Sequence, residues 1–141
     1  MDESKRYQQG LKVRRAVLGD LHVDRSLAET TEFTRDFQQF ITRIAWGEIW
    51  SHPGLPRRTR SLLTLAMMVA LNRSQEFRMH VKAALRIGVT REEIKQVLMQ
   101  AAIYCGVPAA NSAFRIASEA FEELDQESAL EETRRKHRQA R

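Results

Sequence analysis

Apolar residues recur at helical spacing along almost the whole chain, and this pattern restricts the fold more than any other feature. In residues 33–44 the apolar side chains lie at offsets of 4, 7, 8 and 11 from the first, which places them in one stripe on an α-helix. The stripe consists of Phe33, Phe37, Phe40, Ile41 and Ile44. No segment alternates apolar and polar residues over the length of a strand. The chain of 141 residues therefore predicts an all-α fold, a single compact domain of about six helices joined by short turns.

Several of the expected helices have recognisable ends. Ser74 is the expected N-cap of a helix over residues 75–87, and Gly88 is expected to end that helix. Thr90 and Glu93 have the spacing of a capping box. Six helices are expected in all: about residues 4–18, the segment that carries 33–44, 57–71, 75–87, a helix from Thr90 to Gly106, and one with Pro108 in its first turn.

The excess of basic residues lies at the C-terminus. The chain has 23 Lys and Arg against 18 Asp and Glu, and five of the basic residues lie in segment 133–141, which has no acid. We expect residues 1–125 to form the helical domain and residues 126–141 to form a charged, basic tail that is solvated or frayed. Because the rest of the chain is neutral, no nucleic-acid partner is expected. A non-catalytic helical module whose tail binds an acidic partner is an alternative function.

Cysteine content and hydropathy exclude several classes of protein. A single cysteine, Cys105, excludes a disulfide framework and a multi-cysteine zinc site, and we expect its side chain to be a small buried hydrophobe. Residues 1–5 lack the apolar segment of a secretory signal. The longest apolar run, Leu65 to Leu71, is far shorter than the ~20 residues of a membrane span. We therefore expect a soluble, cytoplasmic protein that does not bind a membrane.

Glu76 and His80 form the most informative pair. They lie four residues apart and therefore on one side of a helix, next to small or apolar residues. A carboxylate that accepts the imidazole N–H would fix the ring and tune its pKa, which makes a proton-transfer unit. A buried structural pair or a surface pair is the alternative. No third ligand has a supporting spacing, so no metal is expected.

Aromatic and basic residues nearby add further candidates. Trp46 and Trp50 are also four residues apart, so they either wall a pocket or belong to the core or an interface. Tyr104 lies at the joint between the last two helices, where its hydroxyl could enter a cavity. Three arginines open the helix over 57–71, although the helix dipole disfavours cations there, so a ligand carboxylate or a salt bridge between subunits would explain them. These arginines are Arg57, Arg58 and Arg60.

Taken in order, these motifs resemble the carboxymuconolactone decarboxylase family, which belongs to the alkylhydroperoxidase D-like group, over roughly residues 7–124. The matching segments are Trp46-Gly47-x-x-Trp50, Pro53-Gly54, Arg58-Thr59-Arg60-Ser61, Glu76-x-x-x-His80, Gly88-Val89-Thr90-x-x-Glu93-Ile94 and Tyr104-Cys105-Gly106-Val107-Pro108-Ala109-Ala110. The alkylhydroperoxidase D proteins carry Cys-x-x-Cys just before the corresponding histidine. Residues 73–76 here are Arg-Ser-Gln-Glu, which disfavours thiol peroxidase activity. The sequence departs from the family at His52, where an arginine is frequent.

The resemblance implies a decarboxylase without a cofactor that acts on a small lactone with two carboxylates, in the catabolism of aromatic compounds. It implies that His80, tuned by Glu76, is the catalytic acid. Arg60 would hold a substrate carboxylate, Tyr104 would donate to the lactone oxygen or orient His80, and Trp46 would wall the pocket. It also implies an alkylhydroperoxidase D-like all-α fold in a homo-oligomer, often a hexamer. A family member that acts on another small lactone or acid is the alternative.

Overall fold

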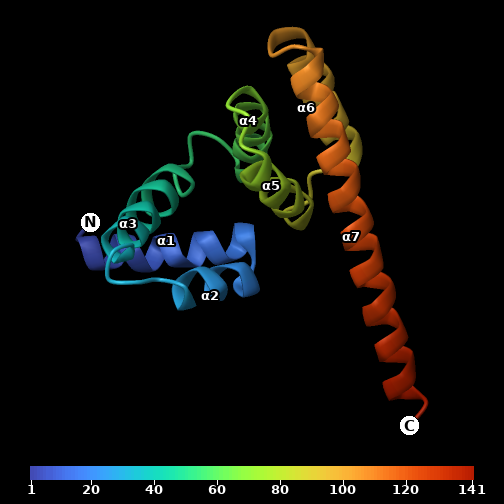
Figure 1. Cartoon of the computed structure of the whole chain (residues 1–141). Coiled ribbons are helices and arrows are strands. Elements are labelled where there is room, and N and C mark those ends of the chain that lie inside the picture. The colour runs from blue at the N-terminus through green and yellow to red at the C-terminus, as the bar shows by residue number, and fades with distance from the viewer.

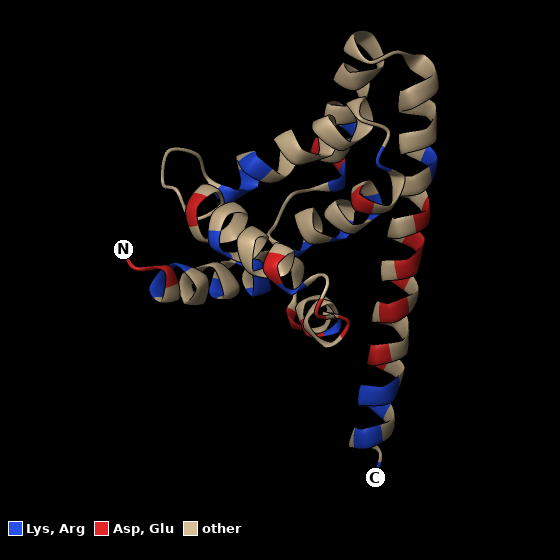
Figure 2. Ribbon diagram, turned by 60° about the vertical axis from the view of Figure 1, so that its left-hand side comes forward, with Lys and Arg blue, Asp and Glu red and all other residues tan.

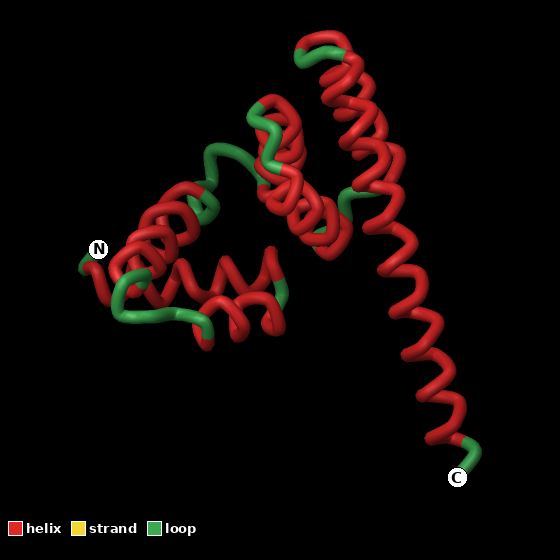
Figure 3. The backbone as a smooth tube through the Cα atoms, viewed as in Figure 1, coloured by secondary structure: helices red, strands yellow, loops and turns green.

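Helices occupy most of the chain, and no strand occurs in the computed structural model, which describes residues 1–141. Connections between the helices are short, and the longer loops precede α3 and α4 (Figure 3). The expected all-α fold is confirmed, with seven α-helices in place of about six. The elements (Figure 1) are α1 (Glu3–Leu18), α2 (Asp20–Ala28), α3 (Arg35–Ile41), the π-helix η1 (Thr42–Ile49), α4 (Arg57–Ala70), α5 (Ser74–Arg86), α6 (Arg91–Tyr104) and α7 (Val107–Gln139).

The helix that the sequence pattern did not predict is α2. Gly19, with a φ of +90°, ends α1 and directly precedes α2, and glycine adopts this conformation without a steric penalty. The expected end of the first helix is therefore correct, but the chain turns and continues as a helix. Only Val23 of α2 is buried, so the segment has too few apolar positions to show a helical period.

Two buried apolar clusters share α5. The larger cluster joins α4, α5, α6 and α7 and includes Leu65 and Phe77. The smaller cluster joins α1, α2, η1 and α5 and includes Val17, Trp46 and Ala83. Helix α5 therefore lies between the two halves of the fold, as Figure 1 shows, and any side chain on it can be placed where both halves meet.

Local sequence signals set the junction between α5 and α6. The Thr90 hydroxyl accepts a hydrogen bond from the Glu93 N–H at 3.1 Å, and the Glu93 carboxylate accepts one from the Thr90 N–H at 3.0 Å, so the capping box is confirmed. Gly88 has a φ of +94°, and the N–H groups of Gly88 and Val89 donate to carbonyls in the last turn of α5. These two backbone hydrogen bonds form a Schellman motif, which ends the helix as expected.

Of the two other predicted helix starts, one is confirmed and one is wrong. Pro108 lies in the first turn of α7 as expected. The prediction that Ser74 caps α5 is wrong, because Ser74 is the first helical residue and the N-cap is Arg73, without a capping bond from a side chain.

Helix α1 crosses η1 with backbone against backbone. A Cβ atom added at Gly10 would lie 1.9 Å from the Thr42 carbonyl oxygen, and one added at Gly47 would lie 2.5 Å from the Arg6 carbonyl oxygen. Only glycine therefore fits at these two positions. Residues 42–49 form a π-helix, which has wider turns than an α-helix and is frequent at functional sites. This close crossing buries Trp46 against α1.

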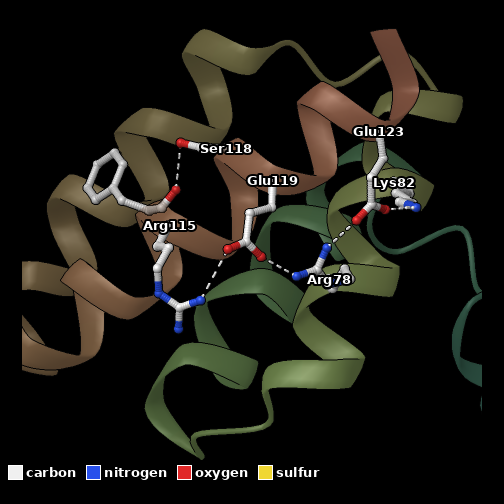
Figure 4. A network of polar contacts seen from close by, with 7 residues as sticks. Arg78, Lys82, Arg115, Ser118, Glu119 and Glu123 are labelled. Carbon is white, nitrogen blue, oxygen red and sulfur yellow. Dashed lines mark hydrogen bonds and ion pairs between the residues drawn. The ribbon is translucent and has the colours of Figure 1, made fainter. Parts of the chain in front are cut away.

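Ion pairs fasten α5 to α7 (Figure 4). Arg78 of α5 pairs with Glu119 and, at 2.6 Å, with Glu123 of α7, and the Lys82 ammonium lies 2.6 Å from the other oxygen of Glu123. Arg115 of α7 binds Glu119 from within the same helix at 3.3 Å. These half-buried pairs hold the first half of α7 along α5.

The second half of α7 extends away from the other helices. Every residue from Asp125 onward is exposed, yet the helix continues to Gln139. Figure 2 shows its acidic stretch followed by a basic end. The segment expected to be solvated or frayed is therefore solvated and helical, because its Ala, Glu, Lys, Arg and Gln residues favour helix without any packing.

The chain exposes a large surface, which includes several large apolar side chains. Its accessible area is 9640 Å², whereas a compact monomer of this mass exposes about 7,500 Å². The expected apolar stripe faces outward at its start: Phe33, in the turn before α3, is 95% exposed, and Phe37 of α3 is 61% exposed. Within the chain, helix α4 buries only one face, and Leu63 and Met67 on its other faces are exposed.

None of the helices combines the length and the apolar character that crossing a membrane requires.

Candidate active site

His80 lies on α5, and two tryptophans of the η1 segment lead to it. The Trp46 and Trp50 rings stack with centroids 4.9 Å apart and planes 28° apart, and the Trp50 and His80 rings follow at 6.4 Å and 11°. Trp46 is buried, and Trp50 and His80 are half-buried. The three rings form one aromatic wall that runs from η1 to α5. The structure thus links two predicted site residues, Trp46 and His80, through Trp50.

Burial keeps the His80 ring neutral at neutral pH. The pKa of His80 is lowered from 6.5 to about 4, first because burial disfavours the charged ring and second because His22 is near. The carboxylate of Glu76 acts in the opposite direction and raises this pKa. The Nδ1 atom of His80 is buried and has no hydrogen-bond partner, so its hydrogen-bonding capacity is unused within the chain.

Glu76 does not hold the His80 ring. The two residues share one side of α5, but no hydrogen bond joins them, and Glu76 is exposed in the first turn of the helix. The expected bond between carboxylate and imidazole is therefore wrong. A solvated carboxylate acts on the ring only through space, where water and salt weaken its effect.

Arg60 is a cation without a carboxylate partner. Its guanidinium donates to the His52 carbonyl oxygen at 3.4 Å, and its Nε atom is buried and unpartnered. It therefore points toward the loop that follows η1. The His52 ring itself accepts the Gly54 N–H at 2.9 Å, so it braces the tight turn of this loop.

Arg58 has a structural role inside the chain. It donates to the Gly88 carbonyl oxygen at 2.6 Å and pairs with Glu93, the residue of the capping box. A salt bridge between subunits was one explanation for the arginines at the start of α4. Arg58 instead forms its salt bridge within the subunit.

Tyr104 does not lie on the aromatic wall of its own chain. It is 82% exposed at the joint between α6 and α7 and lines a groove of about 460 Å³ between α4 and α6. None of the three rings of the wall contributes to this groove. Cys105 lines the same groove and is exposed, so the expectation that it is buried is wrong.

His22, which lies near His80, and Arg14, which lies near His22, were not predicted from the sequence. His22 of α2 is close enough for its charge to lower the pKa of His80. The pKa of His22 is itself lowered, first by burial and then by the charges of Arg14 and Arg25. No motif marks His22, because α2 was not predicted, and Arg14 looks in the sequence like the other arginines of α1.

A cleft of about 620 Å³ opens beside His22, between α2, α5 and α7. Its lining includes Arg25 of α2 and Met79 of α5, the residue before His80. No three side chains of His, Cys, Asp or Glu come together in a group that could hold a metal ion.

Comparison with known proteins identifies the class. The pattern of the carboxymuconolactone decarboxylase family matches residues 35–119, which include the aromatic wall. The 4-carboxymuconolactone decarboxylase of Acinetobacter baylyi is 51% identical over 124 residues, which cover 88% of this chain and 92% of that protein. The nitrosuccinic acid decarboxylase npaB of Metarhizium robertsii is 38% identical over 118 residues, 84% of this chain and 82% of that protein. The chain belongs to the carboxymuconolactone decarboxylase family.

Proposed function

We propose that this chain is a cytoplasmic carboxy-lyase that converts 4-carboxymuconolactone to β-ketoadipate enol-lactone without a cofactor, in the catabolism of aromatic compounds through protocatechuate. The observation that carries the proposal is the 51% identity to the Acinetobacter decarboxylase over most of both chains. The residues before His80 support it, because Arg73, Ser74, Gln75 and Glu76 offer no thiolate for peroxidase chemistry.

The reaction breaks the bond between a ring carbon and its carboxylate. CO2 leaves, and the electron pair moves through the ring double bond to the lactone carbonyl, which gives a furan-like dienolate. A proton then adds to carbon to give the enol-lactone. The site must therefore hold the remaining carboxylate with a cation, stabilise charge on the lactone oxygen, and deliver one proton.

His80 is proposed to supply the proton. In the free chain its imidazole is neutral at pH 7, because its pKa is about 4, and a neutral imidazole N–H can polarise a carbonyl. A substrate with two negative charges favours the charged ring and raises its pKa. The ring then takes a proton from solvent on binding and passes it to carbon. Glu76 assists from a distance, because its charge also raises the pKa of His80.

The other predicted site residues receive supporting roles. Arg60 is proposed to hold a substrate carboxylate, which its lack of an acidic partner supports, and Trp46 walls the pocket through its stack with Trp50. Tyr104 lines the α4–α6 groove of its own chain. A role for Tyr104 at His80 therefore requires a second copy of the chain to bring its tyrosine there.

The protein is further proposed to be a homo-oligomer, a hexamer by the resemblance. The large accessible area and the exposed apolar residues of α3, α4 and α6 support a subunit that buries more surface on assembly. Light scattering coupled to size exclusion tests this. We expect a mass several times 16.3 kDa, and Phe37→Glu, which places a charge on the exposed apolar face of α3, should reduce it. A monomeric wild-type protein would contradict the proposal.

Turnover of 4-carboxymuconolactone by purified, chelator-treated protein tests the function. We expect release of CO2 together with the enol-lactone, and loss of activity in His80→Gln. His137→Gln in the exposed end of α7 is the matched control and should retain full activity. Absence of CO2 release by folded wild-type protein would refute the proposed substrate.

Nitrosuccinic acid is the second candidate substrate, because the Metarhizium relative named for it is 38% identical. The same assay with nitrosuccinic acid separates the two candidates, and we expect the lactone to give the larger kcat/KM.

A further inference from the structure

The second half of α7 has no neighbour within the chain. Every residue from Asp125 onward is exposed, although the helix continues to Gln139. Figure 1 shows this part of α7 extending away from the other helices, and its charges are segregated, with acids first and cations at the end (Figure 2). A stable helix that is polar on nearly every side usually carries many ion pairs along its own length or bridges to another body.

Five charged residues of this segment form one stripe along the helix, called the charged stripe below. They lie 4, 7, 11 and 14 positions after the first, which places them within about 80° of one another around the helix axis. The first two are acids and the other three are arginines. The charged stripe consists of Glu127, Glu131, Arg134, Arg138 and Arg141.

The charged stripe has no ion-pair partner in the chain. Nearer the start of α7, Glu119 and Glu123 both pair with Arg78 of α5 (Figure 4). Beyond residue 125 the only ion pair joins Lys136 to Glu132 within the helix. No pair of the chain includes a residue of the charged stripe. Ion pairs along its own length therefore do not account for this helix.

Like charges adjoin within each half of the charged stripe. Both steps of four residues join like charges, Glu127 with Glu131 and Arg134 with Arg138, and such pairs destabilise a helix slightly. The three arginines and two neighbouring side chains line a hollow of about 280 Å³ that has no acidic wall. A carboxylate that enters this hollow would offset the repulsion between the arginines.

Two copies of the charged stripe are complementary when they run antiparallel. A two-fold axis between residues 132 and 133 places Glu131 opposite the partner's Arg134 and Glu127 opposite the partner's Arg138. Because the contact is isologous, each of these two ion pairs occurs twice. A parallel pair in register would instead set like charges against each other, which opposes association.

We propose that the charged stripe binds the charged stripe of a second copy of this chain, antiparallel and in this register, so that the end of α7 is a site of association between subunits. A second copy neutralises both halves of the stripe, whereas a separate polyanion would neutralise only its arginines. Exposed ion pairs are individually weak, so pairing is strongest between subunits that the apolar surfaces of α3, α4 and α6 already hold together. The inference concerns the end of α7 and does not depend on the proposed substrate.

Cross-linking of the full chain tests the pairing and its direction. In a Cys105→Ser background, which removes the only native thiol, a cysteine replaces either Leu130 or Gln139, both of which are exposed. In the antiparallel register the two copies of residue 130 lie about 8 Å apart along the axis, and the two copies of residue 139 about 20 Å apart. A short bismaleimide should therefore join Leu130→Cys at least about tenfold faster than Gln139→Cys. Equal rates would overturn the antiparallel register, and no cross-link in Leu130→Cys would overturn the pairing.

Charge reversal tests the complementarity. Glu127→Arg with Glu131→Arg makes the stripe wholly basic and should slow the Leu130→Cys cross-link about tenfold or more, because every contact becomes repulsive. Addition of Arg134→Glu and Arg138→Glu exchanges the charges of the paired positions and should restore the rate to within about twofold of the parent. A four-residue exchange that stays as slow as the two-residue reversal would refute pairing of the stripe with itself.

A matched control lies on the opposite side of the same helix. Glu122→Arg with Glu132→Arg changes the net charge by the same amount, and both residues are exposed. We expect this variant to cross-link within about twofold of the parent, since neither residue belongs to the charged stripe. An equal slowing in the control would mean that net charge, and not the stripe, governs association. Nucleic acid retained through the arginines without a cross-link in Leu130→Cys would assign the basic end to a polyanion and overturn the proposal. Turnover of the lactone should be unchanged in every variant, so failure of the proposed substrate leaves this inference standing.

Discussion

The Trp50 indole and the His80 imidazole lie almost parallel, with planes 11° apart and centroids separated by 6.4 Å. Trp50 in turn stacks on Trp46, which is buried against α1. The indole thus shields the imidazole on one side, and burial is the largest cause of the lowered pKa of His80.

Replacement of the indole should change the acidity of the imidazole. In Trp50→Ala we expect the pKa of His80 to rise by about one unit or more toward its ordinary value, because water reaches the ring. Trp50→Phe keeps an aromatic ring there and should cause a smaller rise. Nuclear magnetic resonance titration of the His80 ring protons measures both. An unchanged pKa in Trp50→Ala would show that the indole does not shield the ring.

The lowered pKa of His80 predicts a loss of stability in acid. Between its ordinary pKa of 6.5 and about 4 the unfolded chain holds a proton on His80 that the native chain does not, so stability falls as the pH falls through this window. The contribution is at most about 3.4 kcal/mol. Urea unfolding at pH 7.5 and pH 4.5 should show a larger loss for the wild type than for His80→Gln. Equal losses would contradict the lowered pKa.

Gly10→Ala should strongly destabilise the α1–η1 crossing. The added methyl group would lie 1.9 Å from the Thr42 carbonyl oxygen, so the helices must move apart. We expect a loss of about 2–4 kcal/mol in unfolding free energy and a weaker near-ultraviolet circular dichroism signal from the tryptophans. Gln8→Ala, at an exposed position of the same helix, is the control and should be neutral or slightly stabilising.

Arg78→Gln should weaken the attachment of α7 to α5. Arg78 pairs with two half-buried carboxylates of α7 (Figure 4). Its removal deprives both carboxylates of this partner. We expect a loss of about 1 kcal/mol that shrinks at high salt. Arg115→Gln removes a pair to the same Glu119 from within α7 and should cost less than about 0.5 kcal/mol. An equal loss of unfolding free energy in the two variants would mean that the ion pairs between α5 and α7 stabilise the fold no more than the pair within α7.

Deletion of residues 126–141 should leave the fold intact. Every residue of this segment is exposed, and its only ion pair, Lys136 with Glu132, is internal. We expect a melting temperature within about 3 °C of the full chain and unchanged decarboxylation. A large drop in stability or activity would show that the segment belongs to the domain.

Local signals made most helix ends predictable, whereas packing set the rest. The capping box of Thr90 and Glu93 acts through backbone atoms three residues apart, so the sequence alone is sufficient to find it. Helix α2 contributes a single buried residue, Val23, and one apolar position is too few to reveal a helical period in the sequence. The helical state of residues 126–139 follows from residue propensities, which act even where a segment has no apolar face to bury.

The candidate site was predictable only in part, for a related reason. Spacing brings Trp46 and Trp50 together because both lie on one short segment. Arg14 and Arg15 have the same chemistry and adjacent positions, and only tertiary packing buries one and leaves the other with acids at the surface. The absence of a hydrogen bond between Glu76 and His80 was unpredictable for the same reason. Helical spacing places two residues on one side of a helix but does not fix the direction of their side chains.

The π-helical form of η1 limits how this segment can change in length. Each residue of an α-helix advances the chain by about 100° around the axis, and a π-helical turn contains roughly one residue more. Deletion of one residue between Thr42 and Trp50 would turn everything downstream relative to the glycine contact with α1. Trp50 would then leave the stack. Substitutions that preserve ring shape are therefore far easier to accommodate in this segment than a change of one residue in its length.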